Sequence, residues 1–325
     1  MREIAFIKQN KEKWLQFESA IKEKNISHPE ELSKLYLHLI NDLAFAQTYY
    51  KKSKLVVYLN HLTILAFQKI YKSKKEDKNR VLQFFLLDIP LLFYHYKKYI
   101  YYSFIIFGVS VGIGLISAIY DDSFVRLILS DGYVNQTLEN IKEGNPTAVY
   151  KSGTNWGSFI GITFNNLYVG LKAFVFGITG GIGTAYVMLY NGIMLGSFQY
   201  FFAKHGVLLQ SVKGIWIHGA MEIFAIVMEG AIGLMLGASI IFPKTFKRLD
   251  SFKRGMRDGI KMMIATFPFT IAAGFLEGFV SRYGNDMPTA LAFFIILSTL
   301  SLISYYFLIY PHKVVAKITS DSSLV

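Results

Sequence analysis

The feature that most constrains this chain is a set of long stretches with almost no charged side chain. Several of them run for about 18 to 26 residues, long enough for a helix to cross a hydrocarbon core of roughly 30 Å. Hydrophobic residues make up 53% of the 325 residues and charged residues only 17%, which is too apolar for an ordinary soluble domain. The pattern excludes a soluble enzyme, a disordered chain and a disulfide-rich secreted module.

These stretches predict an all-α fold, a polytopic helical membrane protein with about six transmembrane helices. The bundle is expected over residues 99–312, followed by a tail at 313–325. The link between the second and third spans is very short and uncharged, so it is either a tight turn or a broken helix within the membrane. The predicted spans are residues 101–120, 158–178, 182–202, 214–240, 262–280 and 289–309.

Basic residues are distributed unevenly among the segments that flank these spans. Residues 1–100 contain 18 Lys and Arg residues and residues 241–261 contain seven, whereas residues 121–153 contain three against five acidic residues. Lys and Arg concentrate in cytoplasmic segments. Both termini and residues 241–261 are therefore expected in the cytoplasm, and residues 121–153 on the outer side.

Residues 1–80 precede the spans and carry apolar side chains at helical spacing. Leu39 and Leu43 belong to one apolar stripe, and Leu55 and Leu59 belong to another. The spacing predicts a cytoplasmic segment of two or three packed helices.

Residues 81–98 join this segment to the first span. Their apolar run is short and is interrupted by Asp88 and Pro90, which favours an elbow helix at the membrane interface over a spanning helix. Tyrosines and lysines, among them Tyr94 and Lys97, follow as an aromatic and basic girdle typical of a membrane boundary.

The net charge of +12 is explained by the lipid bilayer as a partner, because the basic residues lie beside apolar spans where anionic headgroups attract them. We expect no nucleic-acid partner, since no motif for nucleic-acid recognition is present. The chain has no cysteine, which excludes disulfides and thiolate metal sites. No cofactor is expected.

Polar residues within the predicted spans are costly, so each is a candidate for a functional role with a partner. His218, Glu222 and Glu229 fall on one face of the fourth span. Lys172 and Glu229 lie at similar predicted depths, which predicts an ion pair between them, either direct or mediated by water. His218 and Glu277 are matched in depth as well. The intramembrane polar core is Asn165, Asn166, Lys172, Asn191, His218, Glu222, Glu229 and Glu277.

Glycines at four-residue spacing recur within the spans. Such glycines allow two helix backbones to approach closely, either within one chain or across a homodimer. Packing within the chain is expected for most pairs, with a homodimer interface open for one or two. The predicted helix-packing glycines are Gly177, Gly181, Gly192, Gly196, Gly219, Gly233 and Gly237.

The ordered motifs resemble the stage II sporulation protein M family of bacterial membrane proteins. The matching residues are Asn165-Asn166, the glycines at 177 and 180–183, Asn191-Gly192-x-x-x-Gly196 and His218-Gly219-x-x-Glu222. The similarity covers about residues 84–310, and the His-Gly-x-x-Glu version looks like the broader branch in bacteria that do not sporulate. The resemblance implies a multi-pass component of the bacterial inner membrane, which in spore formers works with peptidoglycan-degrading proteins during engulfment.

Three interpretations remain open. The leading one is a non-enzymatic component of a cell-envelope complex with other membrane or envelope proteins as partners, for which neither catalytic residues nor a metal are assigned. The second is a transporter or permease subunit, favoured if the polar residues converge on a cavity. The third is a metal-dependent intramembrane hydrolase that uses His218 and Glu222, with Glu229 as a further candidate and the third ligand unassigned.

Overall fold

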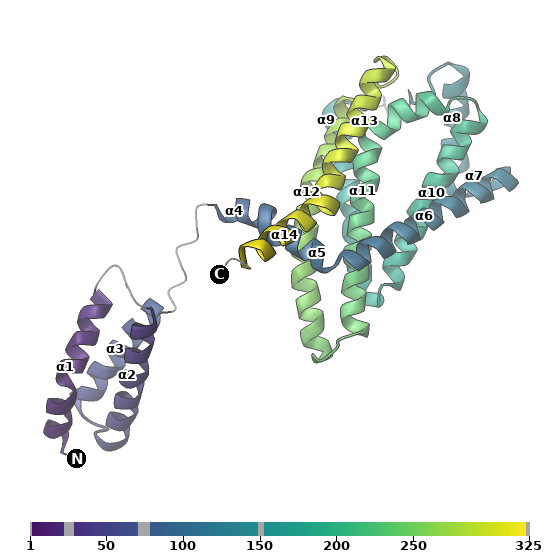
Figure 1. Cartoon of the computed structure of the whole chain (residues 1–325). Coiled ribbons are helices and arrows are strands. Elements are labelled where there is room, and N and C mark those ends of the chain that lie inside the picture. The colour runs from purple at the N-terminus through teal and green to yellow at the C-terminus, as the bar shows by residue number, and fades with distance from the viewer. Residues whose placement is uncertain (1, 23–28, 71–78, 149–152, 323–325) are drawn as a thin grey trace. The chain divides into compact units, whose positions relative to one another are not determined.

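A computed structural model describes residues 2–22, 29–70, 79–148 and 153–322. The described residues form helices and no strand, as expected for an all-α protein. The chain divides into two compact units, residues 1–80 and residues 81–325, which we describe separately (Figure 1).

The N-terminal unit consists of helices α1 (Glu3–Lys22), α2 (Pro29–Tyr49) and α3 (Lys54–Ile70). Each helix contributes one apolar face to a shared core, which includes Trp14, Leu43 and Leu59. The indole N–H of Trp14 donates a hydrogen bond of 2.9 Å to Asp42, which fixes α1 against α2. The unit therefore has its own hydrophobic core.

The second unit is a bundle of long helices. Among the described residues, five helical segments are long and apolar enough to cross a membrane. Two of the helices are longer than the predicted spans 214–240 and 262–280, since they have 34 and 32 residues and begin before the apolar stretches. These segments contain α6 (Lys97–Tyr120), α9 (Asn155–Val175), α11 (Leu208–Ile241), α12 (Arg248–Phe279) and α13 (Thr289–Ser304).

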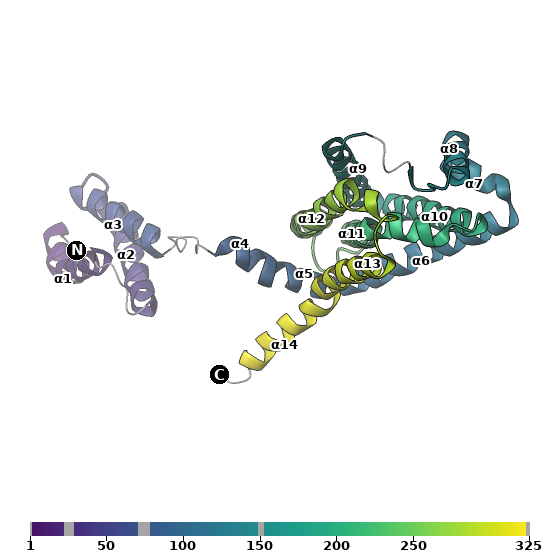
Figure 2. The ribbon, with the colours of Figure 1, turned by 90° about the horizontal axis from the view of Figure 1, so that it is seen from above.

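The predicted span 182–202 forms a sixth long helix, α10 (Ile182–Lys204), which lies alongside α6 (Figures 1 and 2). It is less apolar than the five others because Asn191, Gln199 and several tyrosines interrupt it. A methyl group at Gly192 would lie 2.5 Å from Ser110 Cβ, and one at Gly196 would overlap the backbone at Val111. The two helices are thus close enough for glycine to be required at both positions.

A tight turn joins α9 to α10. The 3₁₀ helix η3 (Phe176–Thr179) is followed by Gly180 and Gly181, whose φ angles are +75° and +89°. Residues with a Cβ rarely adopt this left-handed region, so the two glycines permit the reversal. The turn packs against Gly237 and Ile241 of α11. The link between the second and third predicted spans is therefore a tight turn and not a broken helix.

The two ends of the bundle differ in their connections. We call the end with the 176–181 turn and the 242–247 link the turn end. The opposite end carries α7 (Asp122–Leu129) and α8 (Asp131–Lys142), and we call it the loop end. There Val125 and Val134 pack with Phe202 and Ile215, so the segment between α6 and α9 is folded onto the bundle.

The elbow before α6 consists of α4 (Arg80–Gln83), a π-helical turn η1 (Phe84–Asp88) and α5 (Ile89–His95). Ile89 and Phe93 are buried, and the Phe93 ring packs edge-on against Phe307. Phe307 lies in the π-helical turn η5 (Tyr305–Ile309), which joins α13 to α14 (Tyr310–Ser322). The elbow is therefore anchored to the last span through its apolar face.

Candidate functional site

Polar side chains from five helices line one cavity of about 520 Å³ in the loop-end half of the bundle. The cavity lies between the α6–α10 pair and the group formed by α9, α11 and α12, and residues of α7 and α8 line it as well. Most of its wall is apolar. The polar residues at its wall are Tyr133, Asn165, Asn166, Tyr190, Asn191, His218, Glu222 and Glu277.

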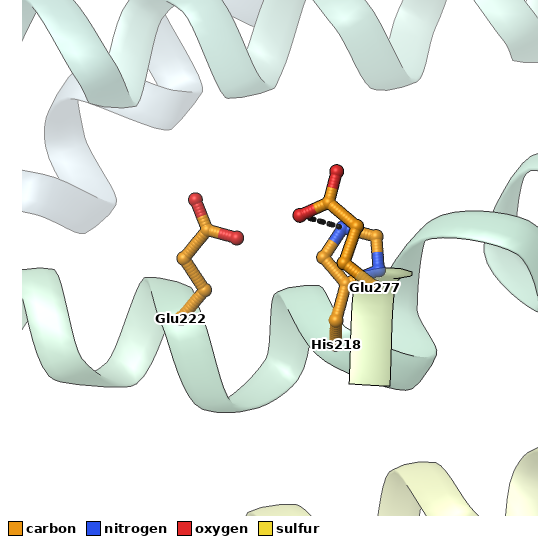
Figure 3. A group of neighbouring side chains, drawn as sticks. All are labelled: His218, Glu222 and Glu277. Carbon is orange, nitrogen blue, oxygen red and sulfur yellow. Dashed lines mark ion pairs between the residues drawn. The ribbon is translucent and has the colours of Figure 1, made fainter. Parts of the chain in front are cut away.

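The acidic cluster in this cavity consists of His218, Glu222 and Glu277, shown in Figure 3. Nε2 of His218 lies 3.4 Å from a carboxylate oxygen of Glu277, so the two depth-matched residues are in contact. Glu222 is one helical turn beyond His218 on α11, and its carboxylate points to the same space. One ligand atom of each residue lies within 4.8 Å of the others.

Ser281 orients the imidazole ring of the acidic cluster. Its hydroxyl lies 2.8 Å from Nδ1 of His218, and both residues are buried. A hydroxyl both donates and accepts, so Ser281 accommodates either neutral tautomer of the ring. Sequence reasoning missed Ser281, although it follows Glu277 by four residues, the spacing that places two side chains on one helical face.

The three asparagines of the predicted polar core also border the cavity. Asn165 donates to the side-chain oxygen of Asn166 at 3.4 Å, and Asn191 donates to the carbonyl oxygen of Val187 at 2.8 Å. Asn166 neighbours the Glu222 carboxylate, and its amide nitrogen is buried without a well-formed hydrogen bond. The cavity therefore offers amide groups as well as carboxylates to a ligand.

Glu229 does not reach the cavity. It is 1% exposed and accepts a hydrogen bond of 3.0 Å from the hydroxyl of Thr266 on α12. Its carboxylate fills the space beside Gly170, where a methyl group would overlap it. Glu229 is thus packed between α9, α11 and α12.

The predicted Lys172–Glu229 ion pair is wrong. Gly170 faces Glu229, and Lys172, two residues farther along, is turned by roughly 200° around α9. Its ammonium group instead lies 5.6 Å from the centre of the Phe176 ring. Matched depth put the two residues at one level but left the rotation of α9 undetermined.

The predicted packing glycines fall into two groups. Methyl groups at Gly177, Gly233 and Gly237 would overlap backbone atoms of neighbouring segments, as described above for Gly192 and Gly196. Gly181 forms the turn. At Gly219, by contrast, a methyl group would meet only Ile215 of its own helix, at 3.6 Å, because this residue lines the cavity.

A second pocket, of about 480 Å³, lies at the turn end, and its charged lining is mostly basic. Its charged residues are Lys98, Lys244, Arg254, Arg257 and Asp258, with His95 beside them. Tyr96 donates a hydrogen bond of 2.9 Å to Asp258. Burial, together with this carboxylate, raises the pKa of Tyr96 well above 10.0.

Two family models match this chain, one in each of its two compact units. A family model for stage II sporulation protein M matches residues 103–282, which is more than half of the chain and includes the whole acidic cluster. A domain of unknown function, DUF8413, matches residues 4–72, which fall within the N-terminal unit. Neither a curated protein nor a solved structure shows a significant match. Together with its long apolar helices, the first match identifies the chain as an integral membrane protein that belongs to the stage II sporulation protein M family.

Proposed function

We propose that this protein binds a small cationic ligand in the acidic cavity and acts as a transporter or permease subunit. The observation that carries the proposal is the convergence of polar side chains from α9, α10, α11 and α12 on one cavity within the spans. Polar residues that only hold helices in register pack against each other, as Glu229 and Thr266 do. A cavity with two carboxylates instead has room for a partner of opposite charge.

The contacts around the cavity indicate which parts would move. On its turn-end side, the α6–α10 pair meets α11 where the Ser103 hydroxyl donates to the Val227 carbonyl at 2.5 Å and where Met188 packs onto Gly230. A ligand that crosses the bundle has to pass this closed contact. We therefore expect the α6–α10 pair to rock against the rest of the bundle during transport.

The absence of cysteine from the sequence makes a direct test simple. Asn191→Cys places a thiol in the cavity, and Val187→Cys, one turn earlier on α10, places the control thiol at a buried position 4% exposed. Membrane-impermeant thiosulfonates applied to sealed vesicles should modify the first variant and spare the second. The carboxylates should make a cationic reagent react faster than an anionic one, by about tenfold or more.

Two results would contradict this proposal. An unreactive thiol at position 191 would mean that water does not enter the cavity. Equal rates for the two reagents, unchanged by Glu222→Gln, would mean that the carboxylates do not select cations. The same vesicles, prepared in right-side-out and inverted form, test the proposed orientation in the bacterial inner membrane, with the loop end outside and both termini in the cytoplasm.

Family membership supports a second, compatible proposal, that the protein works in a cell-envelope complex with other membrane or envelope proteins. The N-terminal unit, with its own core, is the proposed docking module for a partner. Purification in mild detergent followed by quantitative mass spectrometry should recover an envelope enzyme or an ATPase at stoichiometric amounts. A homodimer without other proteins would contradict the complex.

Gly108 and Gly112, whose Cα atoms have open space beside them, would be the first positions to cross-link in such a dimer.

A further inference from the structure

We propose that His218, Glu222 and Glu277 form a binding site for a divalent transition-metal ion, with Zn²⁺ as the reference ion. This inference deepens the proposed function, because it names the cation that the cavity holds. It rests on the geometry of the three ligands, the support of the histidine ring, the balance of charge and the space beside the cluster.

The geometry requires little rearrangement. Ligands bound about 2.1 Å from a tetrahedral ion lie about 3.4 Å from each other. Nε2 of His218 and the nearer carboxylate oxygen of Glu277 are already 3.4 Å apart. Glu222 completes the set within 4.8 Å, and rotation about its flexible side-chain bonds can bring its carboxylate nearer.

The histidine ring is held as metal-ligating histidines usually are. A ligating imidazole commonly donates its other N–H to a neighbouring acceptor, which fixes the ring and its tautomer. Here the Ser281 hydroxyl, 2.8 Å from Nδ1, is that acceptor. With the proton on Nδ1, the lone pair of Nε2 points toward the carboxylates and is available to the ion.

The charges of the cluster also call for a cation. Two carboxylates that share a site within apolar spans repel each other strongly. Among the described residues, neither Glu222 nor Glu277 forms an ion pair with Lys or Arg, and the nearest basic group to Glu277 is the imidazole of His218 at 3.4 Å. A divalent ion bound by two carboxylates and a neutral imidazole would balance the charge. One nitrogen and two oxygen donors suit Zn²⁺ and related ions.

The cavity supplies the remaining coordination position. The cluster borders the 520 Å³ space, where Asn165, Asn166 and Asn191 offer further polar groups to a water molecule or ligand. The buried amide nitrogen of Asn166 is the polar atom there without a well-formed hydrogen bond. Three protein ligands and one open position are the arrangement of catalytic rather than structural zinc sites. In this set Glu277 is the third ligand that the hydrolase interpretation left unassigned.

The test uses the full chain in nanodiscs after treatment with a chelator. Wild type should bind one Zn²⁺ per chain, measured by elemental analysis, and Co²⁺ should give the visible absorption of a low-symmetry site. His218→Ala and Glu277→Gln should abolish saturable binding. Ser281→Ala should weaken it by about 10- to 100-fold, as loss of a ring-orienting partner does. Glu229→Gln, a buried acid on the same helix outside the cluster, is the matched control and should bind like wild type.

The outcomes separate this inference from the proposed function. No stoichiometric Zn²⁺ in wild type, or equal binding in wild type and His218→Ala, would overturn the metal site. If Asn191→Cys still reacts faster with the cationic reagent, the cavity accepts another cation and the proposed function stands. As a control for folding, each variant is compared with wild type after both have been treated with the chelator. Variants that lose the metal but unfold at the same temperature as metal-free wild type show that the ligands act locally and not through the fold.

Discussion

The two ends of the bundle have pockets of similar size but opposite character. At the loop end the cavity holds two carboxylates and a histidine, and at the turn end the pocket is lined mainly by lysines and arginines. Helix α11 runs through both, with His218 and Glu222 toward the loop end and Gly233 and Gly237 toward the turn end. One half of this helix therefore lines the acidic cavity, and the other half packs tightly against its neighbours.

The packing residues explain how this division is maintained. At the turn end, glycines allow α9, the 176–181 turn and α11 to approach at backbone distance. At the loop end, the side chains of Phe202 and Ile215 fill the space below α7 and α8. Between these two packed layers the helices separate and leave the cavity. The predictions below test this contrast, from the largest expected effect to the smallest.

The largest effect is expected from Gly233→Ala. The added methyl group would overlap the Ala173 carbonyl oxygen, and backbone atoms cannot move aside as a flexible side chain can. We expect a loss of about 3 kcal/mol in the free energy of unfolding, which lowers the unfolding temperature in mild detergent by about 6 to 12 °C. Gly219→Ala on the same helix is the control, since its methyl group meets only Ile215. Equal losses in both variants would mean that the two halves of α11 do not differ in packing.

A smaller effect is expected from Thr266→Val, which removes the hydroxyl that donates to Glu229. The carboxyl group would stay buried with one hydrogen bond fewer, at a cost of about 2 kcal/mol in the free energy of unfolding. Thr299→Val is the matched control, because the Thr299 hydroxyl bonds only carbonyls of its own helix. Its cost should be about 0.5 kcal/mol or less. If thermal unfolding finds Thr266→Val as mild as the control, Glu229 is not held by this contact.

These buried acids also show what the sequence can predict. The apolar stretches predicted the helices and the polar core named every residue of the acidic cluster, because hydropathy and residue type are properties of the sequence itself. The contacts between these buried side chains were harder to predict. His218 and Glu277 meet, whereas Lys172 and Glu229 do not, although both pairs were matched in depth. Depth follows from counting residues, but the rotation of α9 depends on Gly170 packing against a neighbour that the local sequence does not reveal.

The cavity itself was beyond prediction for the same reason. It exists because α10 packs on α6 and separates from α11 between the Gly230 contact and the loop-end core. Gly219 illustrates the difficulty, since it was predicted to pack against a neighbouring helix while its surroundings are open. A glycine in the sequence does not distinguish a close helix contact from a cavity wall.

At the turn end, Tyr96→Phe should cost about 1 kcal/mol in the free energy of unfolding, since Asp258 loses a donor. Burial raises the folded-state pKa of Tyr96 above its value in the unfolded chain. The contribution of the hydroxyl is therefore complete below pH 10 and is lost as the pH rises further. Thermal unfolding should show a constant difference between wild type and variant from pH 7 to about 9 that narrows above pH 10. A difference that widens there would contradict the assignment.

The smallest effect concerns the start of α7 at the loop end. Asp121 caps this helix by accepting hydrogen bonds from the backbone N–H and the hydroxyl of Ser123, which lower the pKa of its carboxyl below 3.8. Because the folded-state pKa is depressed, the cap stabilises α7 above the ordinary carboxyl pKa and is lost as the pH falls through the folded value. Asp121→Ala should therefore lower the hydrogen-exchange protection of α7 at neutral pH, and acid should lower it in wild type once the slower intrinsic exchange at low pH is taken into account. Helix α8, capped separately by Ser130, is the internal control. If α7 opens without a change in the labelling of Asn191→Cys, the loop end covers the cavity without controlling access to it.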